Sequence, residues 1–277
     1  MSESNQNIRL LDDIKYSPVG QGNTADILGY SDTAVLKLFH EEMPFDAIEH
    51  EWLNTVAVQD RFENIPKALE FVKYKERYGI IYERITGSDM MNFALTQPHK
   101  HKEFGEILAD LHLKMNEISV PLPDELKQKL ERDIRNGIGL TDDEKNIVIA
   151  ILDDLPRKSF LCHFDFHPGN VMIAEDEYYV IDWMTACSGD PAADVARFLL
   201  LMTFGEPLYA DNAKHLLLSA GMSKIKKSYT EKYMLESGID YSEVESWMVP
   251  VAAARLSELL TDHERGKLIE LVREAIQ

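Results

Sequence analysis

The residues with the clearest capacity for chemistry lie between positions 163 and 182. His163, Asp165 and Asn170 fit the pattern HxDxxxxN, and Asp182 follows Asn170 by twelve positions. An asparagine and an aspartate can supply the oxygen ligands that Mg²⁺ prefers, and leave other positions for water and phosphate. A second aspartate can orient an acceptor hydroxyl, and phosphoryl transfer needs little more from a protein. The spacing therefore favours metal-assisted phosphoryl transfer.

A competing interpretation uses the alternation of His163, Asp165 and His167. In an extended segment all three side chains would share one face and could bind a transition metal, as in a metallohydrolase. That interpretation leaves Asp182 unexplained. We therefore favour phosphoryl transfer.

Three motifs in this region resemble those of one known family. The segments LCHFDFHPGNVM (161–172), IDW (181–183) and GDPAADVA (189–196) occur in that order. They are similar to the catalytic loop, the metal-binding segment and the GDPxxDxA signature of the aminoglycoside phosphotransferase and choline kinase superfamily. The resemblance extends more weakly over the whole chain. It implies a protein-kinase-like bilobal α+β fold, ATP or GTP as donor, and Mg²⁺.

The resemblance also implies roles for matching residues. Asp165 resembles the catalytic residue that orients or deprotonates the acceptor hydroxyl, and Asn170 and Asp182 resemble the magnesium ligands. His163 resembles the histidine that braces the loop. One position departs from the family's pattern, because Phe164 stands where glycine is usual.

The GDPxxDxA match supplies two further acidic residues. Asp190 and Asp194 resemble residues that start the next helix and anchor the catalytic loop, rather than metal ligands. Asp190 before Pro191 also has the form of a helix N-cap followed by proline at the first helical position.

A glycine-containing segment upstream is a candidate for contact with nucleotide phosphates. Residues 20–25 read GQGNTA, so that Gly20 and Gly22 give the pattern GxGxxA between two strand-like runs. Such a pair alone more often marks a turn. Its place before a strand that carries a lysine favours the nucleotide interpretation.

That lysine is Lys37, inside the apolar run 33–39. A lysine in such a run needs an anionic partner. In the kinase template it contacts the donor's phosphates and pairs with a helix glutamate. The segment 48–52 most resembles the family when Glu51 is the partner. Glu49 is the alternative, because each residue of shift in the helix register turns a side chain by about 100 degrees.

The elements that must position these residues change character near 83–87. Residues 1–84 are expected to form a nucleotide-binding lobe, an N-terminal antiparallel sheet with one helix over 46–59. Residues 85–277 are expected to form a larger, mainly helical lobe for catalysis and acceptor binding. A hairpin is predicted within it, from strands 171–174 and 178–182.

Helix starts are predicted from local capping patterns in the second part. Thr96 and Pro98 suit the start of a helix with an apolar stripe through 104–115. Ser or Thr followed three residues later by Glu predicts further starts. These capping boxes are Thr141 with Glu144, Ser242 with Glu245, and Thr261 with Glu264.

Composition and net charge limit the classes of partner that the protein can bind and the compartment that suits it. The net charge of −19 over 277 residues argues against nucleic acid, whose phosphates require a basic surface. Two cysteines, Cys162 and Cys187, are too few for a disulfide framework and suit a reducing compartment. Residues 1–7 lack the features of a secretory signal, and no apolar run is long enough for a membrane span. We expect a cytoplasmic protein.

The acceptor is the least specified partner. The family suggests an aminoglycoside, choline or ethanolamine, or a sugar or amino-acid metabolite, and the acidic balance favours a cation. Four acidic residues near the C-terminus are candidates for binding one, although each alone has the form of a solvated helix charge or a residue of a helix's first turn: Glu236, Glu258, Asp262 and Glu264. The alternative from another class is a catalytically silent nucleotide-binding regulator. Against it, Lys37, Asp165, Asn170 and Asp182 are all present.

Overall fold

A computed structural model describes residues 8–12, 18–22, 24–205 and 212–277. The chain divides into two compact units, 1–88 with 171–185, and 89–170 with 186–277. The expected boundary at residue 84 lies close to the first crossover. The return of 171–185 to the first unit differs from the expected division. Residues 1–7, on which the expectation about a secretory signal rests, lie outside the described residues.

The returning hairpin joins the first unit through backbone contacts. The amide of Val180 donates to the carbonyl of Asn64 over 2.7 Å, and the Asn64 side chain donates to the carbonyl of Tyr178 over 2.8 Å. One asparagine thus ties two residues of the hairpin to the segment that follows the first helix.

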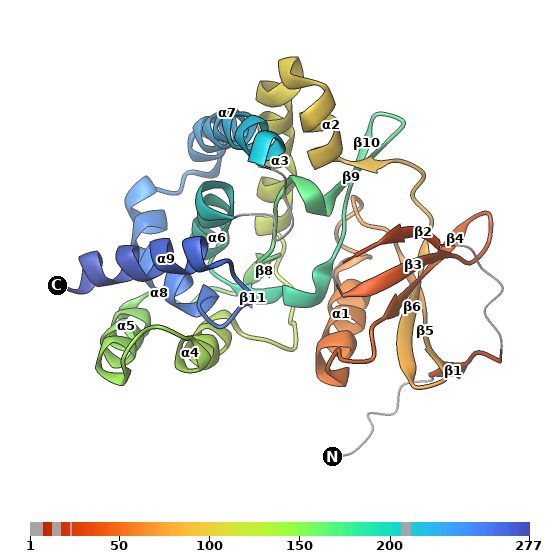
Figure 1. Cartoon of the computed structure of the whole chain (residues 1–277), viewed down its shortest axis with the longest axis horizontal. Coiled ribbons are helices and arrows are strands. Elements are labelled where there is room, and N and C mark those ends of the chain that lie inside the picture. Colours follow the sequence, from red (N-terminus) through yellow and green to blue (C-terminus); the bar gives the residue numbers. More distant parts are fainter. Residues whose placement is uncertain (1–7, 13–17, 23, 206–211) are drawn as a thin grey trace. The chain divides into compact units, whose positions relative to one another are not determined.

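The first unit combines a sheet with one long helix (Figure 1). Its elements are β1 (Arg9–Leu10), β2 (Pro18–Gln21), β3 (Ala25–Gly29), β4 (Ala34–Phe39), α1 (Phe45–Val58), β5 (Ala68–Tyr74), β6 (Arg77–Glu83), β7 (Ser88–Asp89), β9 (Val171–Ala174), β10 (Glu177–Val180) and the 3₁₀ turn η3 (Trp183–Thr185). Strands β1 to β6 form one sheet in the order β1-β5-β6-β4-β3-β2. Its neighbours are antiparallel except β1, which runs parallel to β5, so the expected antiparallel sheet is mixed.

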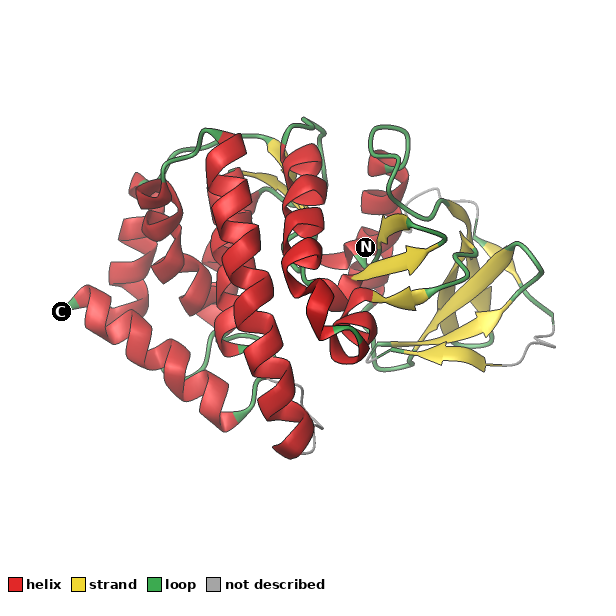
Figure 2. Cartoon of the chain, turned by 90° about the horizontal axis from the view of Figure 1, so that it is seen from above, coloured by secondary structure: helices red, strands yellow, loops and turns green. Residues whose placement is uncertain are grey.

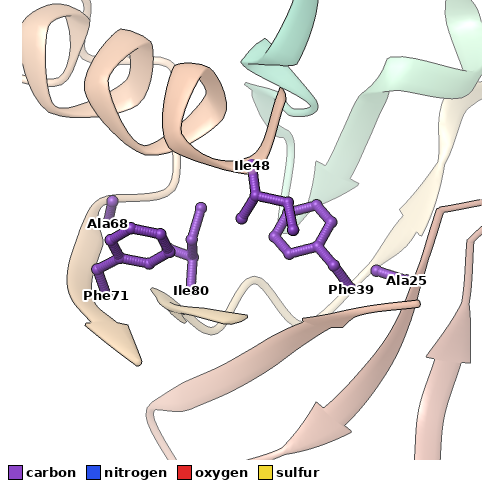
Figure 3. Packing of buried hydrophobic residues seen from close by; sticks show 6 residues of the cluster. All are labelled: Ala25, Phe39, Ile48, Ala68, Phe71 and Ile80. Carbon is purple, nitrogen blue, oxygen red and sulfur yellow. The ribbon is translucent and has the colours of Figure 1, made fainter. Parts of the chain in front are cut away.

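The sheet has two apolar faces because side chains alternate along each strand. On one face Leu36 and Leu38 pack with Val72 and Ile81. On the other, Phe39 packs with Ile48 of α1, as Figure 3 shows. Alternation therefore places Lys37, two residues before Phe39, on the face that α1 covers.

The second unit is mainly helical, with two short strands among the helices (Figure 2). Its elements are α2 (Met90–Thr96), η1 (Pro98–Lys100), α3 (His101–Asn116), α4 (Leu126–Asn136), α5 (Asp142–Asp154), β8 (Phe160–Cys162), η2 (Pro168–Asn170), β11 (Cys187–Gly189), α6 (Pro191–Phe204), α7 (Asn212–Ser237), α8 (Tyr241–Arg255) and α9 (Asp262–Ile276). The fold class is therefore α+β, as predicted.

Two helix starts differ from the prediction. Thr96 ends α2, and a 3₁₀ turn at 98–100 separates it from α3, because Pro98 opens that turn. At α8 the reciprocal capping box is formed by Asp240 and Glu243, two residues before the predicted pair. The box of Thr141 with Glu144 lies where predicted, and Thr261 caps α9 by accepting the amide of Glu264.

No helix in the described part of the chain has the length and apolar character needed to cross a membrane.

Candidate active site

The first group of candidate residues is an ion-pair cluster in the N-terminal unit. Nζ of Lys37 lies 2.7 and 2.8 Å from the two carboxylate oxygens of Glu51, and 3.1 Å from Oδ1 of Asp182. Glu51 is three residues beyond Ile48, so both lie on the face of α1 that meets the sheet. The partner of Lys37 is therefore Glu51.

Burial and charge act against each other in this cluster. Burial lowers the pKa of Lys37, but the Asp182 and Glu51 carboxylates outweigh it and raise that pKa above its ordinary value. For Glu51, burial raises the pKa, and the nearby charge of Asp182 adds to the rise against the opposing effect of Lys37. The Tyr82 hydroxyl donates to Oε1 of Glu51 over 2.8 Å, and burial raises the pKa of Tyr82 well above its ordinary value. Tyr82 therefore stays a hydrogen-bond donor.

Asp182 lies two residues after β10 in a strained conformation. Its φ of 67° lies in the left-handed region, which costs about 1–2 kcal/mol for a residue with a side chain. The next residue is held on both sides: Asn54 donates to the carbonyl of Trp183 over 2.9 Å, and the Trp183 indole donates to the carbonyl of Val180 over 3.0 Å. Strain of this kind gathers at functional positions. The Asp182 side chain is 38% exposed, so it can reach a ligand.

The glycine pair lies at the β2–β3 hairpin. Gly20 pairs with Ile27, and the amide of Gly22 donates to the carbonyl of Ala25 over 2.9 Å. Cβ atoms at Gly20 and Gly22 would stay at ordinary contact distance from their neighbours, 3.6 and 3.5 Å. Packing inside the hairpin does not demand glycine, so close approach of a phosphate stays a prediction. Asn23 of the same segment lies outside the described residues.

The second group lies in the loop after β8, in the second unit. The Asn170 side-chain amide donates to the backbone carbonyl of Asp165 over 2.8 Å and to its Oδ2 over 3.1 Å. Both donations use the nitrogen end of Asn170, which leaves its oxygen as the acceptor end. The Asp165 side chain is 30% exposed.

Asp194 on α6 fixes the backbone of that loop. Its carboxylate accepts the amides of His163 and Phe164 over 2.8 and 2.9 Å, and Nε2 of His112 lies 2.9 Å away. The amide of Asp165 in turn donates to Nδ1 of His163 over 3.2 Å. His163 therefore braces the loop, as the resemblance implies.

The same loop excludes the extended geometry that a metallohydrolase triad needs. Phe164 has a φ of 61°, so the chain turns between His163 and Asp165 and the three alternating side chains do not share one face. His163 is fully buried and uses Nδ1 internally. Among the described residues, no group of three or more His, Cys, Asp or Glu side chains could hold a metal ion.

His167 has a structural contact instead. Its Nδ1 accepts the amide of Gly169 over 3.0 Å. A Cβ atom at Gly169 would lie 2.7 Å from Cε1 of that ring, so a larger residue there would displace the His167 ring from this contact.

Asp165 is surrounded by positive charge. Burial raises its pKa, but His167, Arg197, His163 and Arg255 together outweigh burial and hold the pKa below its ordinary value. The carboxylate therefore stays ionised at neutral pH and can accept a hydrogen bond from a hydroxyl.

The comparison that decides the family is one of sequence. Residues 16–226 match the model of the phosphotransferase enzyme family, APH. The chain belongs to this family. Its activity is accordingly phosphoryl transfer to a hydroxyl group of a small molecule, with a nucleotide as donor.

Solved structures share the phosphotransferase's fold. A thermostable mutant of aminoglycoside phosphotransferase APH(4)-Ia, in a ternary complex with ADP and hygromycin B, matches with a TM-score of 0.66 at 14% identity, covering 94% of this chain and 92% of that chain. Amicoumacin kinase hAmiN, in complex with AMP-PNP, Ca²⁺ and Ami, matches with a TM-score of 0.58 at 14% identity, covering 97% and 90%. ADP-bound APH(2'')-Ib matches with a TM-score of 0.55 at 18% identity, covering 96% and 93%.

Identities this low establish the fold of the phosphotransferase and leave its acceptor open. Comparison with curated protein sequences gives no significant match.

Some residues around the predicted ones were not foreseen. Tyr82 contacts Glu51 across 31 positions, and Arg197 contacts Asp165 across 32. Neither contact leaves a periodic signal in the sequence. Asp262 and Glu264 lie in the first turn of α9, one of the two ordinary roles expected for them. Glu258 and Glu264 also pair with arginines, and Glu264 is only 3% exposed.

Proposed function

We propose that this phosphotransferase uses ATP to phosphorylate a hydroxyl of a small cationic molecule. Asp165 orients the acceptor hydroxyl. Lys37, fixed by Glu51, binds the donor's phosphates, with the glycine hairpin at Gly20 and Gly22 beside them.

The observation that carries the proposal is the contact of Lys37 with two carboxylates from distant parts of the chain. A buried lysine that needed only neutralisation would require one carboxylate, and Glu51 already contacts it with both oxygens. Asp182 adds a second, strained and exposed carboxylate at 3.1 Å. This arrangement supports a site in which phosphate oxygens can take the place of a carboxylate beside Lys37, and a cation can take the place of Lys37 beside Asp182.

Asn170 and Asp182 fit Mg²⁺ as its protein ligands. Hydrogen bonds to Asp165 use the nitrogen end of Asn170 and present its oxygen, and Asp182 is exposed enough to present another. Two oxygen donors without sulfur or imidazole suit a hard cation that keeps waters and binds phosphate. When bound, Mg²⁺ would neutralise charge on the transferred phosphoryl group.

The reaction itself asks little of Asp165. The acceptor oxygen bonds to the γ-phosphorus, the bond to the bridging oxygen breaks, and the hydroxyl proton leaves toward the Asp165 carboxylate or solvent. The lowered pKa of Asp165 makes it a weak base, so we assign it mainly to orientation. Orientation alone can account for a large share of rate enhancement.

Two observations support the choice of donor and acceptor. The complexes of two similar proteins contain the adenine nucleotides ADP and AMP-PNP, which favours ATP over GTP. The net charge of −19 favours a cationic acceptor by electrostatic steering. Hygromycin B and Ami are the small molecules in those complexes, and we include aminoglycosides in the class to be tested.

The test is a screen of aminoglycosides, amino-alcohols and sugars with ATP and Mg²⁺, detecting phosphorylated product by mass spectrometry. Asp165→Asn should lower turnover at least about 10³-fold and leave ATP binding within about twofold. Asp154→Asn, an exposed residue at the end of α5, is the matched control and should change neither. Unchanged turnover in Asp165→Asn would refute its role. A thermal shift with ATP but no product from any acceptor would favour the silent regulator.

A further inference from the structure

Arg197 is a buried cation beside the Asp165 carboxylate. It lies on α6 and is 5% exposed. Its Nη2 lies 3.5 Å from Oδ1 of Asp165, and its Nη1 lies 2.5 Å from Oε1 of Glu258. The guanidinium therefore bridges the loop carboxylate and a carboxylate from the segment after α8.

Two residues on one face of α6 contact the loop that carries Asp165. Asp194 and Arg197 are three residues apart, so both side chains leave the same face of α6. Asp194 binds the backbone amides of His163 and Phe164, whereas Arg197 contacts the side chain of Asp165. One helix face thus fixes both the path of the loop and its functional carboxylate.

Phe164 supports the guanidinium from a third direction. The Arg197 Cζ atom lies 5.6 Å from the centre of the Phe164 ring, within the range of a cation–π contact. Phe164 is 4% exposed and adopts its left-handed φ of 61° in spite of its side chain. The ring is therefore kept beside Arg197 against a local conformational cost.

Glu258 is itself held by a second arginine. Its Oε2 lies 3.4 Å from Nε of Arg255, and Arg255 pairs with Glu264 at the start of α9. The order of groups is Asp165, Arg197, Glu258, Arg255 and Glu264, so negative and positive charges alternate. This alternation locks Arg197 in one orientation.

Stabilisation of the fold does not explain this buried network of ion pairs well. Burying ion pairs costs desolvation that apolar side chains of similar size would avoid. Nε of Arg197 and Nη1 of Arg255 are buried and have no hydrogen-bond partner among the described residues. Burial of these two donors adds to the desolvation cost of the network.

We propose that Arg197 is a positioning residue, which holds the Asp165 carboxylate in the orientation that meets the acceptor hydroxyl. Glu258 and Phe164 fix Arg197 for that task. The inference rests on the proposed function, because it takes Asp165 to orient the acceptor. The contact between Arg197 and Asp165 can be tested without any acceptor.

The first arm of the test is a double-mutant cycle on thermal unfolding. Arg197→Met should lower Tm in the wild-type chain, and should lower it by about 2–4 °C less in an Asp165→Asn background, because the carboxylate it serves is gone. Glu258→Gln repeats the cycle if Arg197→Met does not fold, since it keeps the side chain's shape and loosens Arg197. Additive shifts in both cycles would overturn the proposal.

The second arm measures turnover with an acceptor found in the screen. Arg197→Met should lower kcat about 10- to 100-fold and leave the KM for ATP within twofold, and Arg197→Lys should restore part of the loss. Lys127→Met is the matched control, because Lys127 is also a buried cation, 5% exposed, but donates to the carbonyls of Asp153 and Leu155. It should lower Tm without lowering kcat.

An unchanged kcat in Arg197→Met, or an equal fall in Lys127→Met, would contradict the positioning role. If the wild-type chain phosphorylates nothing, the proposed function fails, whereas the unfolding cycle still decides whether Arg197 holds Asp165.

Discussion

Asp194 and Glu51 are two of the almost completely buried carboxylates in the described part of the chain, and they are held in different ways. Asp194 in the second unit is 0% exposed and Glu51 in the first is 1% exposed. Asp194 accepts two backbone amides and contacts His112, and its pKa is lowered, since these contacts outweigh burial. Glu51 binds a lysine and a tyrosine hydroxyl, and its pKa is raised, chiefly by burial.

Under the proposed function, the difference separates a carboxylate that holds the fold from one that serves the donor site. Against burial, His112 contributes most to the lowered pKa of Asp194, and the backbone amides that Asp194 accepts, which the fold fixes in place, add to it and hold the loop. Glu51 shares Lys37 with Asp182. Under the proposed function, Lys37 also binds the donor's phosphates.

The largest effect is expected from Asp194→Ala. Removing the carboxylate leaves the amides of His163 and Phe164 buried without their acceptor, so the free energy of unfolding should fall by about 3–5 kcal/mol. Urea unfolding followed by circular dichroism measures it. Asp110→Ala is the matched control: Asp110 is half-exposed and pairs with Lys232, so its loss should be at most about 1 kcal/mol. Equal losses of stability in the two variants would show that Asp194 does not have the structural role assigned to it.

Lys37→Met comes next and tests the functional side. It leaves Glu51 buried beside Asp182 without a cation, so stability should fall by about 3 kcal/mol and ATP binding should weaken strongly. The double variant Lys37→Met with Glu51→Leu should recover much of the stability, since it removes the unpaired charge. It should not recover ATP binding, measured by calorimetry. Recovery of both would make the pair structural, like Asp194.

The sequence predicted the parts of this comparison that depend on local pattern. The apolar run around Lys37 indicated that this lysine needs an anionic partner, and the resemblance to the family favoured Glu51 over Glu49, which the contact in the structure bears out. The motif with Asp165, Asn170 and Asp182 was likewise visible, although its roles remain proposals.

Long-range contacts and competing local patterns could not be predicted in the same way. Tyr82 and Arg197 reach their carboxylates through the tertiary fold, and spacing gives no hint of either. At α8 two capping patterns overlap. The helix begins at Tyr241, so Asp240 with Glu243 forms the box and Ser242 lies inside the first turn. A capping box predicts a helix start well only where no second candidate overlaps it.

Tyr82→Phe removes one of the donors to Glu51 and keeps its lysine. A hydrogen bond to a charged group contributes about 1.5–3 kcal/mol, and the lower value is expected because Lys37 remains. Unfolding in urea gives the loss. Tyr74→Phe, in the neighbouring strand β5, serves as control. A loss as large as that of Lys37→Met would mean that the tyrosine, not the lysine, is the main partner of Glu51.

The pH dependence of stability should have opposite signs at the two carboxylates. The pKa of Asp194 is lowered, so its stabilisation is present above the usual aspartate pKa of about 3.9 and is lost as the pH falls through the folded value. The pKa of Glu51 is raised, so its ionisation opposes folding as the pH rises above about 4.3. Each proton changes the slope by at most about 1.4 kcal/mol per pH unit.

Asp194→Asn should therefore flatten the loss of stability in acid, and Glu51→Gln should steepen the rise of stability above about pH 4.3. Unfolding free energies from pH 3 to 7 measure both slopes. Two variants that shift the curve in the same direction would show that the two environments do not differ as described.

The smallest effect is expected at a carboxylate that is only partly buried, Glu144, whose side chain is 20% exposed. Glu144 accepts from Arg273 over 2.6 Å and from the amide of Thr141, and these contacts, Arg273 first, lower its pKa to about 2. Its contribution is therefore fully present above its ordinary value of 4.5 and is lost as the pH falls through about 2. Glu144→Gln should lower the urea midpoint slightly at pH 7, and the difference should shrink in 1 M salt, because partly exposed charges are screened there. A difference that persisted in high salt would have to come from the capping hydrogen bonds instead of the charge, and the contrast between buried and partly buried carboxylates would then be one of geometry alone.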